Sequence, residues 1–284
     1  MSEKIAWVIP GGGSRSAYTA GLVYFANKFN LTKPNIIITA SGGAGGSFYY
    51  LADQGDEIPK VWLDILPTKK FANVWRFWKF ADINFLIDEV FKKIKPINIE
   101  KVKKSDVLLY VATNNYKTGE IKFFNNRDNV DLLEVMRATK RAPVFSGLKL
   151  NPVKIEEEYF IDSRVTSHSE LLIQKAIDEG AQKIIVFDNY YKWSSFVSGN
   201  LMFKLWLLFQ NKTFRKKQLQ YLEILNNFQI PKNKDILVIR PQKRLRILPW
   251  SNNKKDLERI FHQAEQDFND VYPHISHGVY GGIF

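Results

Sequence analysis

The chain has 284 residues, of which 45% are hydrophobic and 25% are charged, so it can bury a sizeable core and is not disordered as a whole. It contains no cysteine, which excludes disulfides, thiolate zinc sites, iron–sulfur clusters and cysteine nucleophiles, and only four histidines are present for a histidine-based enzyme. The formal net charge of +12 suits simple solubility, an anionic lipid surface or nucleic acid, but no nucleic-acid-binding signature occurs, so we expect no nucleic acid partner.

The first residues lead directly into a strand-like run, without the charged and apolar regions of a secretory signal. The most apolar later run, Leu201 to Phe209, is interrupted by Lys204 and has about half of the roughly 20 residues needed to span a bilayer. We therefore expect no signal peptide, no transmembrane segment, and a cytoplasmic protein that is at most peripheral at a membrane.

The chain begins with two short apolar runs, each followed by a glycine-rich turn and a helix-like stretch. Residues 4–9 predict a buried strand and residues 16–29 predict a helix. Residues 36–39 are too β-branched for a good helix and predict a second strand, after which a helix ends near Gly55. This order of strand, helix, strand and helix predicts a parallel α/β sheet.

Helical and strand-like patterns alternate through the rest of the chain. An apolar stripe at helical spacing runs from Ile83 to Ile94, so residues 57–94 are predicted to be mostly helical. A turn at Asn114 to Gly119 predicts a hairpin of residues 106–113 and 119–124. The other predicted elements are helices at 131–139, 169–179, about 195–228 and from Leu257 onward, and strands at 153–161, 183–187 and 235–239.

No internal repeat or low-complexity segment divides the chain, so a single domain over residues 1–284 is predicted. We expect its core at roughly 4–190, a helical cap-like insertion at about 190–230, and a C-terminal strand plus helix at about 235–270.

The first glycine-rich turn, Gly11-Gly12-Gly13, follows a strand and opens a helix. Consecutive glycines let a ligand approach the backbone, and the free N–H groups at a helix start face negative charge. Phosphate binding or an oxyanion hole both need this geometry, and a tight structural turn is the alternative. Because Ser16 replaces the last glycine of a dinucleotide fingerprint and no Walker lysine follows, neither nucleotide motif is complete.

The second turn places Ser41 between a predicted strand and a predicted helix, as in a nucleophile elbow. The usual pattern is Gly-x-Ser-x-Gly. Here Gly43 supplies the second glycine and Thr39 stands at the first. A lone Ser-x-Gly is more often a helix N-cap, but its pairing with Gly11 to Gly13 one strand earlier favours a nucleophile.

Together these two motifs resemble those of the patatin-like phospholipases, which combine a triple-glycine loop, an arginine shortly after it and a serine elbow. Arg15 holds the place of that arginine. Asp162, at the end of a strand-like run, holds the place of the family's Asp-Gly-Gly or Asp-Gly-Ala motif. The family uses a Ser–Asp dyad without histidine.

Two further segments extend the resemblance over most of residues 4–270. The stretch from Ala138 to Phe145, with Ala142-Pro143-Val144-Phe145, is similar to the Ala-x-Pro-x-Phe segment before the aspartate motif. Ile239-Arg240-Pro241 and the amphipathic helix after it are similar to the tail of bacterial members. The resemblance implies a three-layer patatin-like α/β fold, with a mainly parallel central sheet flanked by helices.

The resemblance also implies a serine lipid acyl hydrolase of the phospholipase A, lysophospholipase or esterase type. Ser41 would be the nucleophile and Asp162 its base, with a pKa raised by burial. The N–H groups of Gly12 and Gly13, helped by Gly11, would form the oxyanion hole. Arg15 would order this loop, Thr39 and Gly43 would form the elbow, and no metal or cofactor would be needed.

Three positions depart from the family pattern: Ser16, Thr39 and the pair Ser163-Arg164, each replacing glycine. They leave open a catalytically weak or inactive lipid-binding protein of the same fold. A phosphate- or nucleotide-binding regulator and acyl transfer to an acceptor other than water are further alternatives. His168 lies six residues after Asp162, but the resemblance gives it no role, so it is interpreted as a loop histidine.

Two basic, aromatic stretches fit the interface of an anionic membrane, although ordinary packing explains each equally well. The first includes Trp62, Trp75 and Trp78 with Lys69, Lys70, Arg76 and Lys79. The second is Leu201 to Phe209, followed by Lys212, Arg215, Lys216 and Lys217. We expect a lipid or phospholipid substrate and peripheral docking through one of the two.

Overall fold

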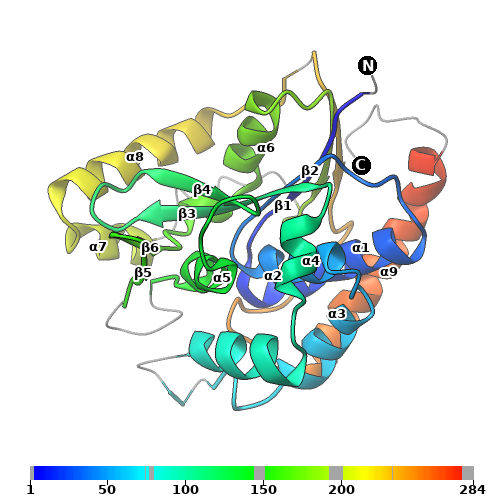
Figure 1. Ribbon diagram of the computed structural model, residues 1–284, viewed down its shortest axis with the longest axis horizontal. Coiled ribbons are helices and arrows are strands. Elements are labelled where there is room, and N and C mark those ends of the chain that lie inside the picture. Colours follow the sequence, from blue (N-terminus) through cyan, green and yellow to red (C-terminus); the bar gives the residue numbers. More distant parts are fainter. Residues whose placement is uncertain are drawn as a thin grey trace.

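The structure is a computed structural model that describes residues 3–73, 75–76, 80–143, 151–191, 201–231 and 233–276. In this part of the chain, eight strands form one sheet with helices on both faces (Figure 1). The strands are β1 (Ile5–Ile9), β2 (Ile36–Thr39), β3 (Leu108–Asn115), β4 (Ile121–Asn125), β5 (Val153–Ile155), β6 (Glu158–Ile161), β7 (Lys183–Phe187) and β8 (Asp235–Ile239).

The sheet has a parallel half and an antiparallel half. Its order is β5-β6-β3-β2-β1-β7-β8, with β4 also paired to β3. The strands from β3 through β2, β1 and β7 to β8 are parallel, whereas β4 and β6 pair with β3 in the antiparallel sense. The mixed α/β fold expected from the sequence is thus confirmed, with a central sheet of mostly parallel strands.

Both faces of the parallel half are buried, because its side chains alternate between two hydrophobic layers. On β1, Trp7 and Ile9 belong to the large core shared with α1 (Ser16–Lys28), α2 (Gly42–Leu51) and α9 (Lys254–Ser276). Ala6 and Val8 face the opposite layer, which is completed by α6 (Ser169–Asp178). This double burial explains why the strands are continuous apolar runs in the sequence.

The remaining helices border the sheet. They are α3 (Glu57–Lys60), the π-helical segments η2 (Val61–Ile65) and η3 (Phe85–Ile94), α4 (Ile99–Lys104), α5 (Leu132–Lys140), α7 (Leu201–Leu208) and α8 (Lys212–Asn227), with the 3-10 turns η1 (Gly13–Arg15) and η4 (Val165–Ser167). Helices α7 and α8 pack against the β6–η4 region through Phe203, Phe214 and Leu222. They occupy the predicted cap-like segment, whose residues 192–200 lie outside the described residues, and the division into core and cap stays a prediction.

One sequence-based element prediction holds in part and another was wrong. Residues 57–94 are helical at both ends, in α3–η2 and in η3, but an irregular segment bridged between Ala72 and Ala81 joins them. Residues 153–161 form a hairpin of β5 and β6 instead of one strand, because Glu156 adopts a positive φ of 54° at the turn between them.

Phe268 on α9 is expected to be essential to the packing of α9 on α1. Its ring is fully buried, with centroids of Phe29 and Tyr272 at 5.8 Å and 5.7 Å. Phe268→Ala should lower the free energy of unfolding by about 3–5 kcal/mol in urea titrations, because it leaves a cavity. Leu219→Ala on half-exposed α8 should change it by less than about 1 kcal/mol. Equal effects of the two changes would contradict this account of the core.

Candidate active site

Ser41 lies at a sharp turn between the end of β2 and the start of α2. Its backbone angles are φ 48° and ψ −121°, a conformation that non-glycine residues rarely adopt. Gly43 N–H donates to the Ala40 carbonyl (3.0 Å), which closes the turn. The residue is half-buried, so its side chain remains accessible. This geometry is that of a nucleophile elbow.

The glycine loop lies directly beside this elbow, at the carboxyl end of the neighbouring strand β1. A Cβ placed on Gly11 would lie 2.5 Å from the Ser41 Cβ, so only glycine allows this approach. Gly13 has a φ of 60°, which also favours glycine. Gly11 N–H is engaged by the Ser167 carbonyl (3.0 Å), while within the described residues the N–H groups of Gly12 and Gly13 make no hydrogen bond. Those two groups are therefore the donors available to an oxyanion.

The strand register explains how Asp162 comes to this edge of the sheet. The last residue of β2, Thr39, is level with Val111, and Ile161 at the end of β6 is level with Asn114. Because β6 runs antiparallel to β3, the chain after Ile161 returns toward the level at which β2 ends. Asp162 thus lies near Ser41, although 121 positions separate them in the sequence.

The carboxylate of Asp162 is buried and hydrogen-bonded. It accepts from Arg164 N–H (2.7 Å), and the Ser167 hydroxyl lies 3.1 Å and 3.2 Å from its two oxygens. Burial raises the pKa of Asp162 above its ordinary value, whereas the hydrogen bonds from Arg164 and Ser167 lower it. Ser41 therefore lies near a carboxylate whose affinity for a proton is increased by burial.

Two residues at the end of α5, Thr139 and Lys140, hold the Ser41 backbone from both sides. Ser41 N–H donates to the Thr139 hydroxyl (2.8 Å), which donates to the Ala112 carbonyl (2.7 Å). The Lys140 ammonium donates to the Ser41 carbonyl. Burial lowers the pKa of Lys140 to about 7, against an opposing attraction to Asp162. Sequence reasoning gave neither residue a role, although both lie within the stretch from Ala138 to Phe145 that resembles the family's Ala-x-Pro-x-Phe segment.

The three departures from the family pattern differ in their consequences. Ser16 has ordinary helical angles, with a φ of −67°, and is fully buried at the start of α1. Thr39 is an ordinary strand residue whose hydroxyl donates to the Ile9 carbonyl (2.9 Å), tying the elbow to β1. Arg164, in contrast, has a φ of 70° and is therefore strained where glycine would not be.

Residues after β7 support the glycine loop from behind. The Asn189 amide donates to the Gly11 carbonyl (3.0 Å). The Arg15 guanidinium donates to the Tyr190 hydroxyl (2.9 Å) and lies 4.5 Å from the centre of that ring. His168 stacks on the same Tyr190 ring, with 5.9 Å between the ring centres. Burial lowers the pKa of His168 to about 3. His168 is thus a neutral histidine that packs against Tyr190.

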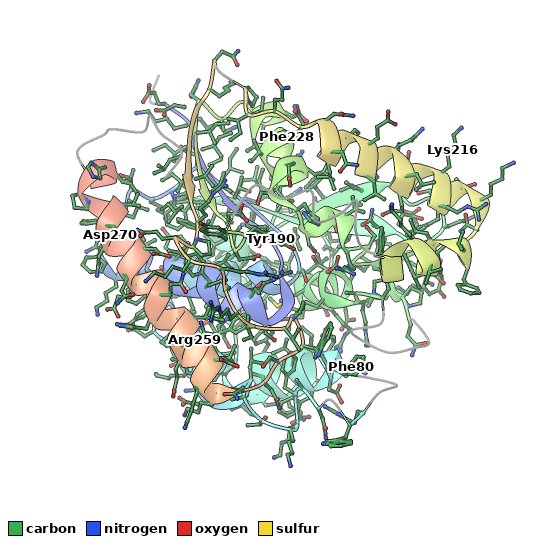
Figure 2. The ribbon with its side chains drawn as sticks, turned by 180° about the vertical axis from the view of Figure 1, so that it is seen from behind. Phe80, Tyr190, Lys216, Phe228, Arg259 and Asp270 are labelled. Atoms are coloured by element: carbon green, nitrogen blue, oxygen red, sulfur yellow. The ribbon has the colours of Figure 1, made fainter. Side chains whose placement is uncertain are left out.

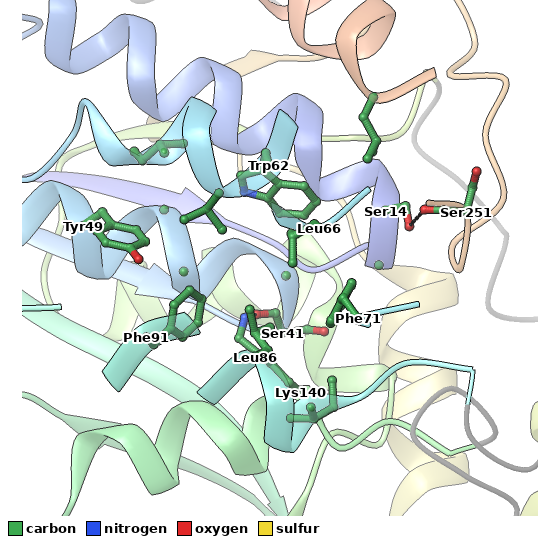
Figure 3. Close-up of a pocket in the computed structure, with 18 residues that line it drawn as sticks. Ser14, Ser41, Tyr49, Trp62, Leu66, Phe71, Leu86, Phe91, Lys140 and Ser251 are labelled. Atoms are coloured by element: carbon green, nitrogen blue, oxygen red, sulfur yellow. Dashed lines mark hydrogen bonds between the residues drawn. The ribbon is translucent and has the colours of Figure 1, made fainter. Parts of the chain in front are cut away.

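An elongated apolar pocket of about 720 Å³, partly open to solvent, begins at Ser41 (Figure 3). Gly45 and Gly46 of α2 line it, and Tyr49 and Phe91 lie at the end far from Ser14 and Ser251. The other lining residues are mostly apolar and come from α3, η2, η3 and their connections: Ile58, Val61, Trp62, Leu66, Phe71, Ile83 and Leu86. Such an apolar lining suits the hydrocarbon part of a ligand.

Some sequence-based expectations cannot be placed. Val144 and Phe145 of the predicted Ala-x-Pro-x-Phe segment, together with Trp78, Lys79 and His277, lie outside the described residues. Among the residues that are described, no group of three or more His, Asp or Glu could hold a metal ion. No helix in the same part of the chain is long and apolar enough to cross a membrane.

The lowered pKa of Lys140 predicts a pH-dependent stability difference. Between about pH 7 and the ordinary lysine value of 10.5, the unfolded chain binds more protons at this residue than the folded chain. Wild-type stability should therefore rise with pH relative to Lys140→Met, by about 2 kcal/mol between pH 8 and pH 10. Urea unfolding at the two pH values measures this, with the exposed Lys255→Met as control. If the unfolding free energies of wild type and Lys140→Met changed equally between the two pH values, the pKa of Lys140 would not be lowered.

Comparison with known proteins identifies the family of the chain. Residues 7–168, more than half of the chain, match the family model for patatin-like phospholipase. No curated protein is similar enough to count as a match. Among solved structures, VipD from Legionella pneumophila has a TM-score of 0.49 and 10% sequence identity, over 95% of this chain and 67% of VipD. The chain belongs to the patatin-like phospholipase family, whose members are generally hydrolytic lipid esterases.

Proposed function

We propose that this protein is a serine lipid acyl hydrolase that cleaves carboxylic esters through an acyl-Ser41 intermediate, with Asp162 as the base. The observation that carries the proposal is the meeting of three features at one point. A strained elbow presents Ser41, the buried carboxylate of Asp162 lies beside it, and an apolar pocket opens from it. The substrate class is a phospholipid, a lysophospholipid or a simpler lipid ester.

In the first half of the reaction, the Ser41 hydroxyl loses its proton to Asp162 while its oxygen attacks the ester carbonyl carbon. The negative oxygen of the tetrahedral intermediate accepts hydrogen bonds from the N–H groups of Gly12 and Gly13. Collapse breaks the bond to the alcohol, which takes the proton from Asp162 and leaves. The acyl group remains on Ser41.

In the second half, Asp162 takes a proton from water as the water oxygen attacks the acyl-Ser41 carbonyl. The same two N–H groups stabilise the second tetrahedral intermediate. Its collapse returns the proton to Ser41 and releases the fatty acid. Because the base must be ionised and burial raises the pKa of Asp162, the acidic limb of the activity profile should lie above the ordinary aspartate value of 3.8.

The apolar pocket supports a substrate with an acyl chain, because this chain would lie in the pocket while its ester group meets Ser41. Ser41 and Gly13 lie along the pocket, which continues between apolar side chains to Tyr49 and Phe91 (Figure 3). An acyl chain in this position would exclude water from the ester carbonyl, and hydrogen bonds from the oxyanion hole are stronger in such surroundings. Helices α7 and α8 are proposed to act as a cap-like part of the same domain.

The strain at Arg164 favours one alternative, a weakly active or inactive lipid-binding protein of the same fold. Arg164 N–H fixes one oxygen of Asp162, so a distorted turn at this position would misplace the base. Catalysis and lipid binding must therefore be measured separately.

Labelling by a fluorophosphonate tests for an activated serine, since the serine oxygen displaces fluoride only when a base removes its proton. The wild type should be labelled, Ser41→Ala should not, and Asp162→Asn should react at least about 100-fold more slowly. Ser47→Ala, on the same helix with its hydroxyl on the Gly43 carbonyl, should keep full labelling.

The Asp162→Asn variant also has a stability readout. Because burial raises the pKa of Asp162, the ionised form lowers stability at neutral pH, so the neutral amide should keep or increase the melting temperature. Loss of labelling with a retained melting temperature would establish the dyad. A folded wild type without any labelling would instead support the lipid-binding alternative.

Filling the pocket should change the acyl-chain preference. A Cβ on Gly45 would lie 3.4 Å from the Phe91 ring, so a larger side chain at this position must occupy the pocket. Gly45→Leu should lower kcat/KM for a long-chain ester at least about tenfold relative to a butyrate ester. Leu219→Ala is the control, because Leu219 is half-exposed on α8. The same substitution at another glycine, Gly180→Leu, is unsuitable because the φ of 81° at Gly180 would strain a leucine. An unchanged ratio would place the acyl chain elsewhere.

A further inference from the structure

Residues 243–255, which precede α9 and include its first two residues, join the glycine loop to the mouth of the pocket. Ser14 N–H donates to the Pro249 carbonyl (2.7 Å), and its hydroxyl donates to the Ser251 carbonyl (2.6 Å; Figure 3). Ser14 and Ser251 both line the pocket. This segment is therefore part of the entrance, although it lies outside the range matched by the family.

A second segment, of which residues 66–73, 75–76 and 80–82 are described, forms the adjoining part of the entrance. The Asn252 amide donates to the Ala72 carbonyl (2.7 Å), and the Trp250 ring stacks on Phe80 at 6.0 Å. Phe80 lies in the lower half of the molecule in the view from behind (Figure 2). Phe71 of the same segment lines the pocket. Contacts between the two segments make them one continuous surface, which we call the mouth surface.

The mouth surface exposes three large apolar side chains. Trp75 is 82% exposed, Leu248 is 58% exposed and Trp250 is 39% exposed. Large apolar side chains that gather in water around a pocket entrance indicate an interaction site. Indole rings in particular favour the boundary between water and lipid.

The charge of the mouth surface identifies the partner. Residues 243–255 contain five basic residues and no acidic one, and residues 66–82 contain four basic residues and one acidic residue, Asp82, which pairs with Arg76 (3.7 Å). Exposed basic side chains accompany the apolar ones: Lys69, Lys70, Lys243, Arg244, Arg246 and Lys255. Basic and aromatic side chains together match the phosphates and the acyl boundary of an anionic bilayer.

We propose that the mouth surface docks on an anionic lipid bilayer, with Trp75, Leu248 and Trp250 at the acyl boundary and the pocket entrance facing the lipid. This inference rests on the proposed function, because a membrane lipid would then pass from the bilayer into the pocket beside Ser41. The docked surface would also be connected to the glycine loop, because Pro249 and Ser251 accept hydrogen bonds from Ser14.

Helices α7 and α8 offer the rival surface. Leu208 and Phe209 are 61% and 86% exposed, with exposed Lys204, Lys212 and Lys216 nearby. These helices pack on the β6–η4 region and contribute no residue to the described pocket lining. A bilayer on that surface would not meet the pocket entrance, so these helices provide a matched control.

Sedimentation with vesicles tests the docking surface, in a Ser41→Ala background so that no lipid is hydrolysed. The vesicles contain phosphatidylcholine alone or mixed with phosphatidylglycerol. Binding should require phosphatidylglycerol and weaken with salt. Leu248→Ser with Trp75→Ser, and separately Lys243→Gln with Arg244→Gln and Arg246→Gln, should each lower binding at least about tenfold. Leu208→Ser with Phe209→Ser should leave it unchanged.

Loss of binding in the α7 variant with retention in both mouth variants would overturn the proposal, as would equal binding to the two vesicle types. Melting temperatures show whether each variant folds, and the charge variant is a second test if the apolar one does not. Because binding is measured without Ser41, its outcome is separate from the proposed function, which fails instead through absent fluorophosphonate labelling of the wild type.

Discussion

The fixed backbone of Ser41 is the constraint on which the other parts of the site depend. Its strained angles are held from α5, which accepts the Ser41 N–H through Thr139 and donates to the Ser41 carbonyl through Lys140. Thr139 is itself tied to the Ala112 carbonyl of β3. Three elements of the sheet and its flank thus stabilise one turn, and the glycine loop and Asp162 are positioned relative to it.

Burial acts on the two ionisable groups beside this turn in opposite directions. It raises the pKa of Asp162 and lowers the pKa of Lys140, because each charged form loses its hydration. Hydrogen bonds from Arg164 and Ser167 partly restore the ionised carboxylate. A base that keeps its charge through directed donors, yet holds a proton more readily than in water, suits transfer from a serine hydroxyl.

Local patterns in the sequence predict much of this arrangement. The β-branched run before Ser41 and the consecutive glycines of the first turn specify strand ends, and parallel strands bring such ends to one edge. Thr139 and Lys140 could not be found this way, since their contact with Ser41 depends on how α5 packs across the sheet. Asn189 could have been found, because it follows a buried strand at the same edge.

The errors in the element predictions have local causes that periodicity does not reveal. The hairpin of β5 and β6 contains Glu156 at positive φ, where glycine or asparagine would have marked the turn. The helical stripe from Ile83 to Ile94 is correct, but it does not extend through the irregular segment after η2, where Phe71 lines the pocket. Apolar residues that line a cavity cannot be distinguished from core residues by their spacing alone.

The part of the chain after residue 168 completes the site that the family motifs begin. Asn189 holds the Gly11 carbonyl and Tyr190 holds Arg15, while Pro249 and Ser251 accept both donors of Ser14. The loop that carries the proposed oxyanion donors is therefore contacted on one side by the end of β7 and on the other by the segment before α9. Its geometry depends on contacts that the matched residues 7–168 do not supply. The same contacts link the loop to the surface at the mouth of the pocket, so the position of the segment before α9 and the geometry of the oxyanion donors cannot vary independently.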